Sequence, residues 1–362
     1  MFAKQLMTRK DKKMAKKGKT IFVCQECGYE STKWMGRCIC GAWNSMVEEK
    51  QIDLNTDDKR RRTGTAASVK GTTEGGGRAA GKPSRLSQVT SGETSRIDTG
   101  IGELNRVLGR GLVPGSLTLI SGEPGIGKST IIIQAAAHIA ASKGTVLYIS
   151  GEESEEQIKI RADRVCDKLP EDLYILAETN IDVIAEACQQ LNPVFLIIDS
   201  IQTMYTSDIE SAPGSVSQVR TCGNELMRIG KMHGIPVFIV AHVTKSGDLA
   251  GPRIVEHMVD CVLSFTGDRN HEMRILRAQK NRFGTTSEIG AFEMAQQGLM
   301  EIENLSGTLL EEMEKDSEGA VVTAVYEGTR PLVFRSAGSD IPKPISDLHG
   351  VQRWEWTIPG SV

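Results

Sequence analysis

The sequence of 362 residues lacks the features of a membrane or exported protein. It contains no apolar run that approaches the roughly 18 residues of a membrane-spanning helix. The basic N-terminus leads into "TIFVC" and not into the apolar segment of a signal peptide. Of the eight cysteines, four are crowded between positions 24 and 40, and the other four are scattered in apolar or helical contexts. We therefore expect a cytoplasmic protein with reduced thiols and no membrane partner.

The chain also has little net charge, with a formal value of −3. This value excludes a general electrostatic argument for nucleic-acid binding. The charge is uneven, however, because residues 1–20 carry eight Lys and Arg against one acidic residue. Such a run is either a solvated tail or a nucleic-acid-binding arm. Met14 is an alternative start, with residues 1–13 as an upstream extension.

The length suits two or three domains, and the composition divides the chain further. A polar segment rich in Gly, Ser and Thr separates a compact cysteine module from a long segment of alternating strands and helices. We therefore expect the following parts: a basic tail (1–19), a cysteine module (20–47), a flexible linker (48–92), an α/β domain (93–297) and a partial C-terminal domain (298–362).

Seven apolar runs predict the strands of the α/β domain. They lie at residues 116–122, 145–150, 173–178, 194–200, 236–242, 261–267 and 273–279. Several are apolar on both faces, which is typical of a central parallel sheet covered by helices. Helical stretches of 10–18 residues separate the first five runs, as in βαβ units. The last two runs lie close together and predict an antiparallel hairpin at the sheet edge.

The segment "GEPGIGKST" predicts a phosphate-binding loop, because it follows an apolar strand and opens an apolar helix. Its glycines allow backbone N–H groups to surround phosphates at a helix N-terminus. Lys128 would bridge the β- and γ-phosphates of a nucleoside triphosphate, and Ser129 would coordinate Mg²⁺. The expected nucleotide-binding residues of the loop are Gly122, Glu123, Pro124, Gly125, Ile126, Gly127, Lys128, Ser129 and Thr130.

Polar residues follow the tips of three further strands. Asp199 ends "VFLIIDS", where a carboxylate can hold Mg²⁺ through water. Glu152 and Glu153 follow "LYISG", where one carboxylate can orient or deprotonate the attacking water and the other can begin a helix. His242 ends "FIVAH" as a γ-phosphate sensor or as a structural histidine. Together these residues predict a Mg²⁺-dependent nucleoside triphosphatase.

The cysteine module "CQECGYESTKWMGRCIC" predicts a zinc site of four thiolates from Cys24, Cys27, Cys38 and Cys40. A segment of this size has no core of its own, so the metal would supply its folding free energy. A redox pair is the alternative. Such a finger would bind either DNA or a partner protein, and the lysines at 10–19 and Trp34 or Trp43 permit both.

The order of these parts resembles the RecA-like core. More narrowly, the segments "FVCQECGYES", "WMGR", "TGIGELNRVLGRGLVPGSLTLISGEPGIGKST", "YISGEES", "GPRIVEHMVD" and "KNRFG" resemble the bacterial RadA (Sms) family over roughly residues 14–334. The resemblance implies a ring, expected to be a hexamer, that moves on single-stranded DNA with the energy of ATP and assists branch migration beside the RecA recombinase in DNA repair. It assigns the catalytic glutamate to Glu152 and the γ-phosphate sensor to His242.

The sequence departs from that family at two places. The family has two residues between its second pair of cysteines, whereas only Ile39 separates Cys38 from Cys40, which makes these two the weaker expected zinc ligands. The family also carries a C-terminal domain that resembles the Lon protease fold. Here only its beginning is recognisable, so we interpret the domain as truncated or altered. We expect residues 300–362 to be poorly ordered, ring assembly to be weakened and activity to be impaired.

The strand that ends in "KNRFG" carries two cations, Lys280 and Arg282, on one face. Because Lys128 is expected to bind the nucleotide of its own subunit, Lys280 and Arg282 are expected to bind a different anion. The first interpretation is the ATP of a neighbouring subunit, because ring motors stabilise the charge on the transferred phosphoryl group in trans. The alternatives are DNA phosphate and an ordinary surface ion pair.

Two loops follow strand tips on the face where RecA-like rings hold DNA, at 203–220 and 243–257. Their candidate DNA contacts are Lys245 and Arg253, followed by Arg220, with a salt bridge or a solvated charge as the alternative for each. Two other functions remain open. One is a clock-type or signalling ring ATPase that acts on protein, and the other is a loading factor that binds nucleotide only to assemble.

Overall fold

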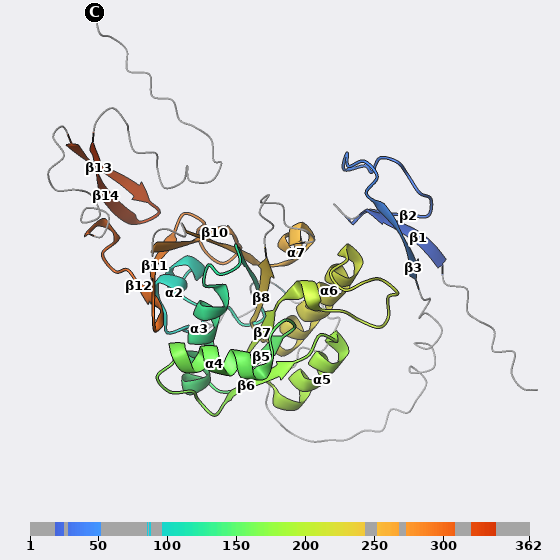
Figure 1. Ribbon diagram of the computed structural model, residues 1–362, viewed down its shortest axis with the longest axis horizontal. Coiled ribbons are helices and arrows are strands. Elements are labelled where there is room, and N and C mark those ends of the chain that lie inside the picture. Colours follow the sequence, from blue (N-terminus) through green and yellow to red (C-terminus); the bar gives the residue numbers. More distant parts are fainter. Residues whose placement is uncertain are drawn as a thin grey trace, which may run out of the picture.

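The computed structural model describes residues 19–24, 28–51, 85, 87, 96–242, 252–267, 273–307 and 320–337. These residues form a three-stranded N-terminal sheet, a nine-stranded α/β core and a two-stranded C-terminal hairpin (Figure 1). The core carries the candidate site.

The nine strands of the core lie in the order β12-β11-β10-β9-β4-β8-β7-β5-β6. Their bounds are β4 Leu117–Gly122, β5 Val146–Ser150, β6 Leu173–Ala177, β7 Phe195–Asp199, β8 Val237–His242, β9 Cys261–Gly267, β10 Met273–Asn281, β11 Ile289–Ala295 and β12 Gly298–Glu301. The six strands from β9 to β6 are parallel, whereas β9 to β12 form an antiparallel meander. All seven predicted strands are present, and the predicted antiparallel pairing of the last two is confirmed.

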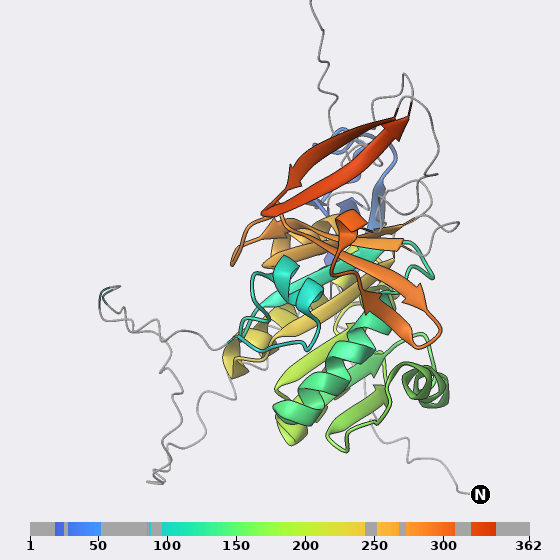
Figure 2. The ribbon, with the colours of Figure 1, turned by 90° about the vertical axis from the view of Figure 1, so that its left-hand side faces the viewer.

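Helices cover both faces of the sheet (Figures 1 and 2). One face packs against α2 Gly102–Leu108, α3 Lys128–Ser142 and α4 Glu155–Val165, and the other against α5 Ile181–Leu191, α6 Val216–His233 and α7 Pro252–Met258. Alternate residues of a central strand pack against the helices on opposite faces of the sheet. In β7, Phe195 and Ile197 belong to the first apolar cluster, and Leu196 and Ile198 belong to the second. Because both faces are buried, the strands are continuously apolar.

The expected position of the β9–β10 hairpin at the sheet edge is wrong. β11 pairs with β10 along Met273 to Arg277, and β12 pairs with β11. β11 has the sequence IGAFEMA, in which glycine and alanine take the place of the β-branched residues that mark a strand. The sheet therefore continues to Glu301, although the part of β10 that holds Lys280 pairs only with β9.

The cysteine module folds around a small antiparallel sheet. Its strands are β1 Lys19–Cys24, β2 Glu30–Ser31 and β3 Met46–Gln51, in the order β2-β1-β3. β1 packs on the core, because Ile21 and Val23 share a buried apolar cluster with Val216 of α6 and Ile254 of α7.

The C-terminal hairpin consists of β13 Ala320–Glu327 and β14 Arg330–Ala337. Gly328 in its turn has a φ of 63°, and a Cβ there would lie 2.6 Å from the carbonyl oxygen of Ser287. Leu332 is buried together with core residues that include Ile289 and Leu305. The described hairpin thus packs on the core, which differs from the poor order expected there, and residues 308–319 and 338–362 of the same expectation lie outside the described residues.

A buried ion pair adds to this contact. Arg330 donates to both carboxylate oxygens of Glu103 on α2, at 2.9 and 3.0 Å, and to the carbonyl oxygen of Glu303 at 3.1 Å. Glu103 also accepts a hydrogen bond from the N–H of Ala291 in β11. A bidentate pair with this degree of burial fixes the hairpin against α2 and β11.

Candidate functional site

The predicted phosphate loop connects β4 to α3, and its glycines are required by geometry. Gly125 and Gly127 have φ values of 81° and 114°, in the left-handed region that favours glycine. A Cβ on Gly127 would lie 2.9 Å from side-chain atoms of Leu299 and Met294. The β11–β12 hairpin therefore packs directly against the loop, a neighbour that the sequence pattern did not predict.

Lys128 lies beneath this loop with only 4% of its surface exposed. Its Nζ donates to the carbonyl oxygens of Gly122 and Glu123 at 2.8 and 3.0 Å. Burial lowers the pKa of the ammonium group from 10.5 to about 8, and the carboxylates of Asp199 and Glu152 oppose this shift. The side chain thus lies at the loop with an incompletely compensated charge, as expected of a group that binds phosphate.

The first helical turn of α3 meets the end of β7. Ser129 donates its hydroxyl hydrogen to Oδ2 of Asp199 at 2.8 Å, and both residues adjoin the phosphate loop. A hydroxyl and a carboxylate are the oxygen ligands that Mg²⁺ prefers in proteins. The donor set of these two residues therefore fits the expected magnesium site.

Tyr148 of β5 is a part of this site that the sequence reasoning missed. Its hydroxyl donates to the same Oδ2 of Asp199 at 2.5 Å, and the side chain is 1% exposed. Burial and the nearby Asp199 carboxylate raise the pKa of the phenol well above 10.0. The signal in the sequence was a tyrosine inside an apolar strand, since a buried phenol needs a hydrogen-bond partner.

The two glutamates after β5 have different partners. Glu152 accepts a hydrogen bond from the Ser200 hydroxyl at 2.5 Å, whereas Glu153 forms an ion pair with Arg161 of α4. The Asp199–Ser200 peptide that places Ser200 is cis. Glu152 is therefore held toward the end of β7, and Glu153 toward a helix.

The parallel strands bring the remaining candidate to the same edge. His242 is the last residue of β8, and its Cα is the register partner of Gly122 at the start of the phosphate loop. Its side chain lies outside the described part of the structure. The backbone thus places His242 beside the loop, at the carboxyl ends of the strands where open α/β sheets bind ligands.

Lys280 near the end of β10 and Arg282 just beyond it both contact the segment 256–260. Lys280 donates to the carbonyl oxygens of Glu256 and His257 at the end of α7, at 2.8 and 3.4 Å. Arg282 pairs with the buried Asp260 at 3.0 Å. Partial burial and the neighbouring Arg282 lower the pKa of Lys280. Both cations therefore have partners within their own chain.

Asn281, between the two cations, points elsewhere. Its side-chain amide donates to the carbonyl oxygens of Val107 and Leu108 at the end of α2, at 3.2 and 3.4 Å. Its Oδ1 accepts the N–H of Phe283 at 2.9 Å. These bonds attach the end of β10 to α2.

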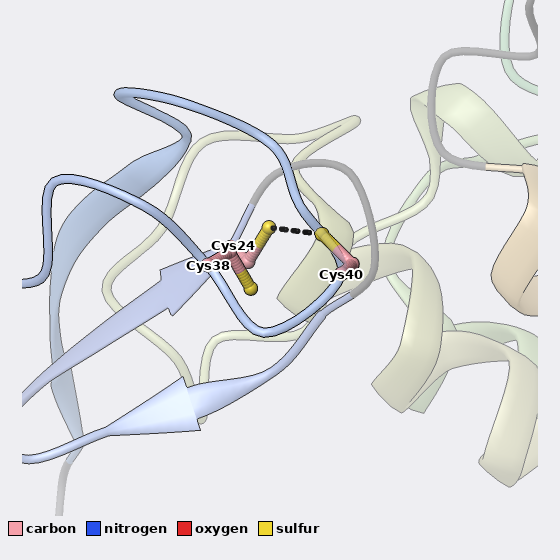
Figure 3. Close-up of side chains that lie close together, drawn as sticks. All are labelled: Cys24, Cys38 and Cys40. Carbon is pink, nitrogen blue, oxygen red and sulfur yellow. Dashed lines mark hydrogen bonds between the residues drawn. The ribbon is translucent and has the colours of Figure 1, made fainter.

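The cysteine module holds three thiols together (Figure 3). The Sγ atoms of Cys24, Cys38 and Cys40 all lie within 4.8 Å of one another, and Cys24 and Cys40 are 3.8 Å apart. Two thiolates at the tetrahedral angle on zinc, with Zn–S bonds of about 2.3 Å, are separated by about 3.8 Å. The C-x-C spacing thus brings Cys38 and Cys40 to one site, and Cys27 lies outside the described residues.

The candidate DNA contacts are only partly visible. Arg220 donates to Glu30 Oε1 at 2.9 Å and to the carbonyl oxygen of Gly28 at 2.8 Å, so it holds the cysteine module. Lys245 lies outside the described residues, as does the side chain of Arg253 on α7. In the described structure the salt-bridge alternative therefore applies to Arg220.

The loop before α6 is tied to that helix by Gln218. Its amide nitrogen donates to the carbonyl oxygens of Thr206, Ile209 and Ser211, each at 3.1 Å, and its oxygen accepts the N–H of Thr206. Gln218 is 1% exposed. These bonds hold residues 206–211 against the helix that carries Arg220.

Comparison with known proteins assigns both modules. An AAA domain profile matches residues 82–248, and a rubredoxin metal-binding domain profile matches residues 22–48. The DNA repair protein RadA of Bacillus subtilis is 53% identical over 318 residues, which cover 88% of this chain and 67% of that protein. RadA of Listeria monocytogenes is 49% identical over 322 residues, with the same coverage of each chain.

The chain belongs to the RadA family of DNA repair proteins. It spans about two thirds of the length of these RadA relatives. The RecA-like core expected from the sequence is confirmed, and the AAA domain and the rubredoxin-type module support ATP and zinc binding in this RadA family member. Among the described residues, no helix is both long and apolar enough to cross a membrane.

Proposed function

We propose that this chain is an ATP-driven motor that moves on single-stranded DNA in recombinational repair and promotes branch migration beside RecA. The observation that carries the catalytic part is the pair of contacts at the ends of β5 and β7, Ser129 with Asp199 and Ser200 with Glu152. Membership in the RadA family supports the DNA repair role.

In this mechanism the loop amides and Lys128 bind the phosphates. The Lys128 ammonium leaves the carbonyl oxygens of Gly122 and Glu123 for the β- and γ-phosphates, which then restore its full charge. Ser129 and Asp199 would hold Mg²⁺, which would supply positive charge against the nucleotide phosphates.

Glu152 acts as the group that orients or deprotonates the attacking water. The hydrogen bond from Ser200 supports this assignment because it holds the Glu152 carboxylate toward the end of β7, where Asp199 lies. The ion pair of Glu153 with Arg161 suits the structural role of that residue. His242, beside the loop at the end of β8, senses the γ-phosphate.

We assign Lys280 and Arg282 to the ATP of a neighbouring subunit in a ring, expected to be a hexamer. Their present partners are carbonyl oxygens at the end of a short helix and one carboxylate. Contacts of this kind can exchange for a phosphate at a subunit boundary, because a phosphate is the stronger acceptor. Lys245 and Arg253 are assigned to DNA, and Arg220 joins them if the cysteine module moves away.

The decisive experiment is ATP hydrolysis by the full chain with and without single-stranded DNA, on the wild type and on Lys128→Ala. We expect DNA-stimulated hydrolysis that Lys128→Ala abolishes. If the rate of hydrolysis is the same with and without DNA, the result favours a ring ATPase that acts on protein partners. Nucleotide binding without turnover favours a loading factor that uses ATP only to assemble.

A further inference from the structure

Tyr148 and Asp199 form a contact between two neighbouring strands that the proposed catalytic roles do not yet use. Tyr148 lies in the middle of β5, and its Cα is the register partner of Ile197 in β7. From there its side chain reaches two residues along β7, so that the hydroxyl oxygen lies 2.5 Å from Oδ2 of Asp199. The ring lies in the apolar cluster beneath α3 and α4.

The direction of this hydrogen bond follows from its chemistry. An ionised carboxylate can only accept, so the phenol donates. Ser129 donates to the same oxygen at 2.8 Å. As a ligand of Mg²⁺, Ser129 would offer an oxygen lone pair to the metal and would still have its hydrogen to donate to Asp199. Tyr148 is the second donor to the same carboxylate oxygen, and it acts from the apolar core rather than from the phosphate loop.

We propose that Tyr148 is a positioning residue that fixes the Asp199 carboxylate for the magnesium–nucleotide complex. This inference rests on the proposed function, because it presumes that Asp199 serves the metal. Groups that hydrogen-bond a metal-binding carboxylate set its orientation, and their removal typically weakens metal affinity or activity about 10- to 100-fold. Tyr148 meets this description because its own orientation is set by a packed core.

The competing view is that Tyr148 is a core residue whose hydroxyl has found an acceptor. The two views differ in what removal of the hydroxyl changes. A core role affects stability and leaves the dependence of nucleotide binding on Mg²⁺ intact. A positioning role changes that dependence and leaves metal-free nucleotide binding intact.

The test uses the full chain with Tyr148→Phe, which removes only the hydroxyl. Tyr174→Phe is the matched control, since Tyr174 lies on the adjacent strand β6 and is 42% exposed. A fluorescent ADP analogue is titrated at a series of Mg²⁺ concentrations and in EDTA. We expect Tyr148→Phe to raise the Mg²⁺ concentration for half-maximal binding by about 10-fold. Binding in EDTA should be unchanged, and Tyr174→Phe should match the wild type in both.

A double-mutant cycle with Asp199→Asn tests whether Tyr148 acts through Asp199. We expect Tyr148→Phe to add little to the effect of Asp199→Asn on Mg²⁺ dependence, because contacting residues are not additive. If the wild type binds the Mg²⁺–nucleotide and Tyr148→Phe shows the same dependence of binding on Mg²⁺, the proposed role of Tyr148 is wrong, but the ATPase mechanism is unaffected. If nucleotide binding by the wild type does not depend on Mg²⁺, the proposed ATPase mechanism is wrong as well.

Discussion

The hydroxyl of Ser200 donates to Oε1 of Glu152 over 2.5 Å and joins the residue after β7 to the segment after β5. In the Tyr148–Asp199 contact the donor lies on β5 and the acceptor carboxylate on β7. Each of the two strands, or the segment that follows it, therefore donates a hydrogen bond to a carboxylate of the other. These two contacts set the relative positions of the expected metal ligand and the expected base, and they give the adjacent glutamates Glu152 and Glu153 different partners.

Glu152→Gln and Glu153→Gln test whether these two glutamates have the different roles that we propose. Loss of a general base typically lowers the rate about 100- to 10,000-fold, so we expect Glu152→Gln to reduce kcat by at least about 100-fold with nucleotide binding retained. Glu153→Gln removes only the charge that pairs with Arg161, and kcat should stay within about 3-fold of the wild type, since pairs of this exposure contribute about 0–1 kcal/mol. Steady-state ATP hydrolysis measures both. Similar losses in the two variants would contradict the assignment.

Nucleotide binding should take up protons above pH 8. The lowered pKa of about 8 leaves Lys128 mostly neutral at pH 8.5 without nucleotide, and phosphate contacts should raise it again. Calorimetry in buffers of different ionisation enthalpy should show uptake at pH 8.5 and almost none at pH 6.5. Lys128→Arg is the control, because arginine remains charged at both values and should show no uptake.

The same lowered pKa affects the stability of the nucleotide-free protein. Between about pH 8 and 10.5 Lys128 binds fewer protons in the folded chain than in the unfolded chain. The contribution of this residue to the free energy of unfolding therefore rises with pH across that window and is lost as the pH falls through about 8. Urea unfolding at several pH values measures this change in the free energy of unfolding, and the change should be absent in Lys128→Arg.

Removal of zinc should release the cysteine module from the core. We expect about one zinc ion per chain by elemental analysis, its loss in Cys24→Ser and its retention in Cys166→Ser, which alters a thiol outside the cluster. A chelator should accelerate amide hydrogen exchange in β1 and at the start of α6, because Ile21 and Val23 pack on Val216 there. Unchanged exchange in β1 after complete zinc removal would show that the module folds without metal.

Lys280 can be tested by complementation between inactive chains. Lys280→Ala and Lys128→Ala should each hydrolyse little ATP alone. If Lys280 serves a neighbour, about a quarter of the interfaces in an equal mixture pair an intact loop with an intact Lys280, and activity should return. No recovery would indicate that Lys280 acts within its own chain by holding the end of α7. Basal activity in Lys280→Ala with loss of only DNA stimulation would indicate a DNA contact.

Arg330→Ala should destabilise the core, because it leaves the buried Glu103 without its bidentate partner. Breaking a buried pair costs about 3–5 kcal/mol, and we expect a decrease of about 3 kcal/mol in the free energy of unfolding. Lys159→Ala is the matched control. It breaks the exposed pair with Asp163 and should cost less than about 1 kcal/mol. Urea unfolding followed by far-UV circular dichroism measures both, and equal effects would show that the hairpin contact is weak.

Much of the core could be predicted because its signals are local. "VFLIIDS" indicates a buried strand that ends in a carboxylate, and "GEPGIGKST" indicates a strand-to-helix loop, whatever the rest of the chain does. β11 was missed because its burial is not visible in IGAFEMA, where glycine and alanine are small enough to lie under α2. The partners of Lys280 and Arg282 could not be predicted, because α7 is brought to them only by the pairing of β9 with β4.

Residues near one another in the chain were enough to predict the first seven strands of the core, the phosphate loop and the pairs of cysteines. The sequence left Glu152 and Glu153 equivalent on chemical grounds, and it did not distinguish Tyr148 from its apolar neighbours. The folded sheet gives these residues different partners, because β5 and β7 are adjacent in it although about fifty residues apart in the chain. Hydrogen bonds of buried polar groups depend on such neighbours, and these arise when the sheet closes around its core.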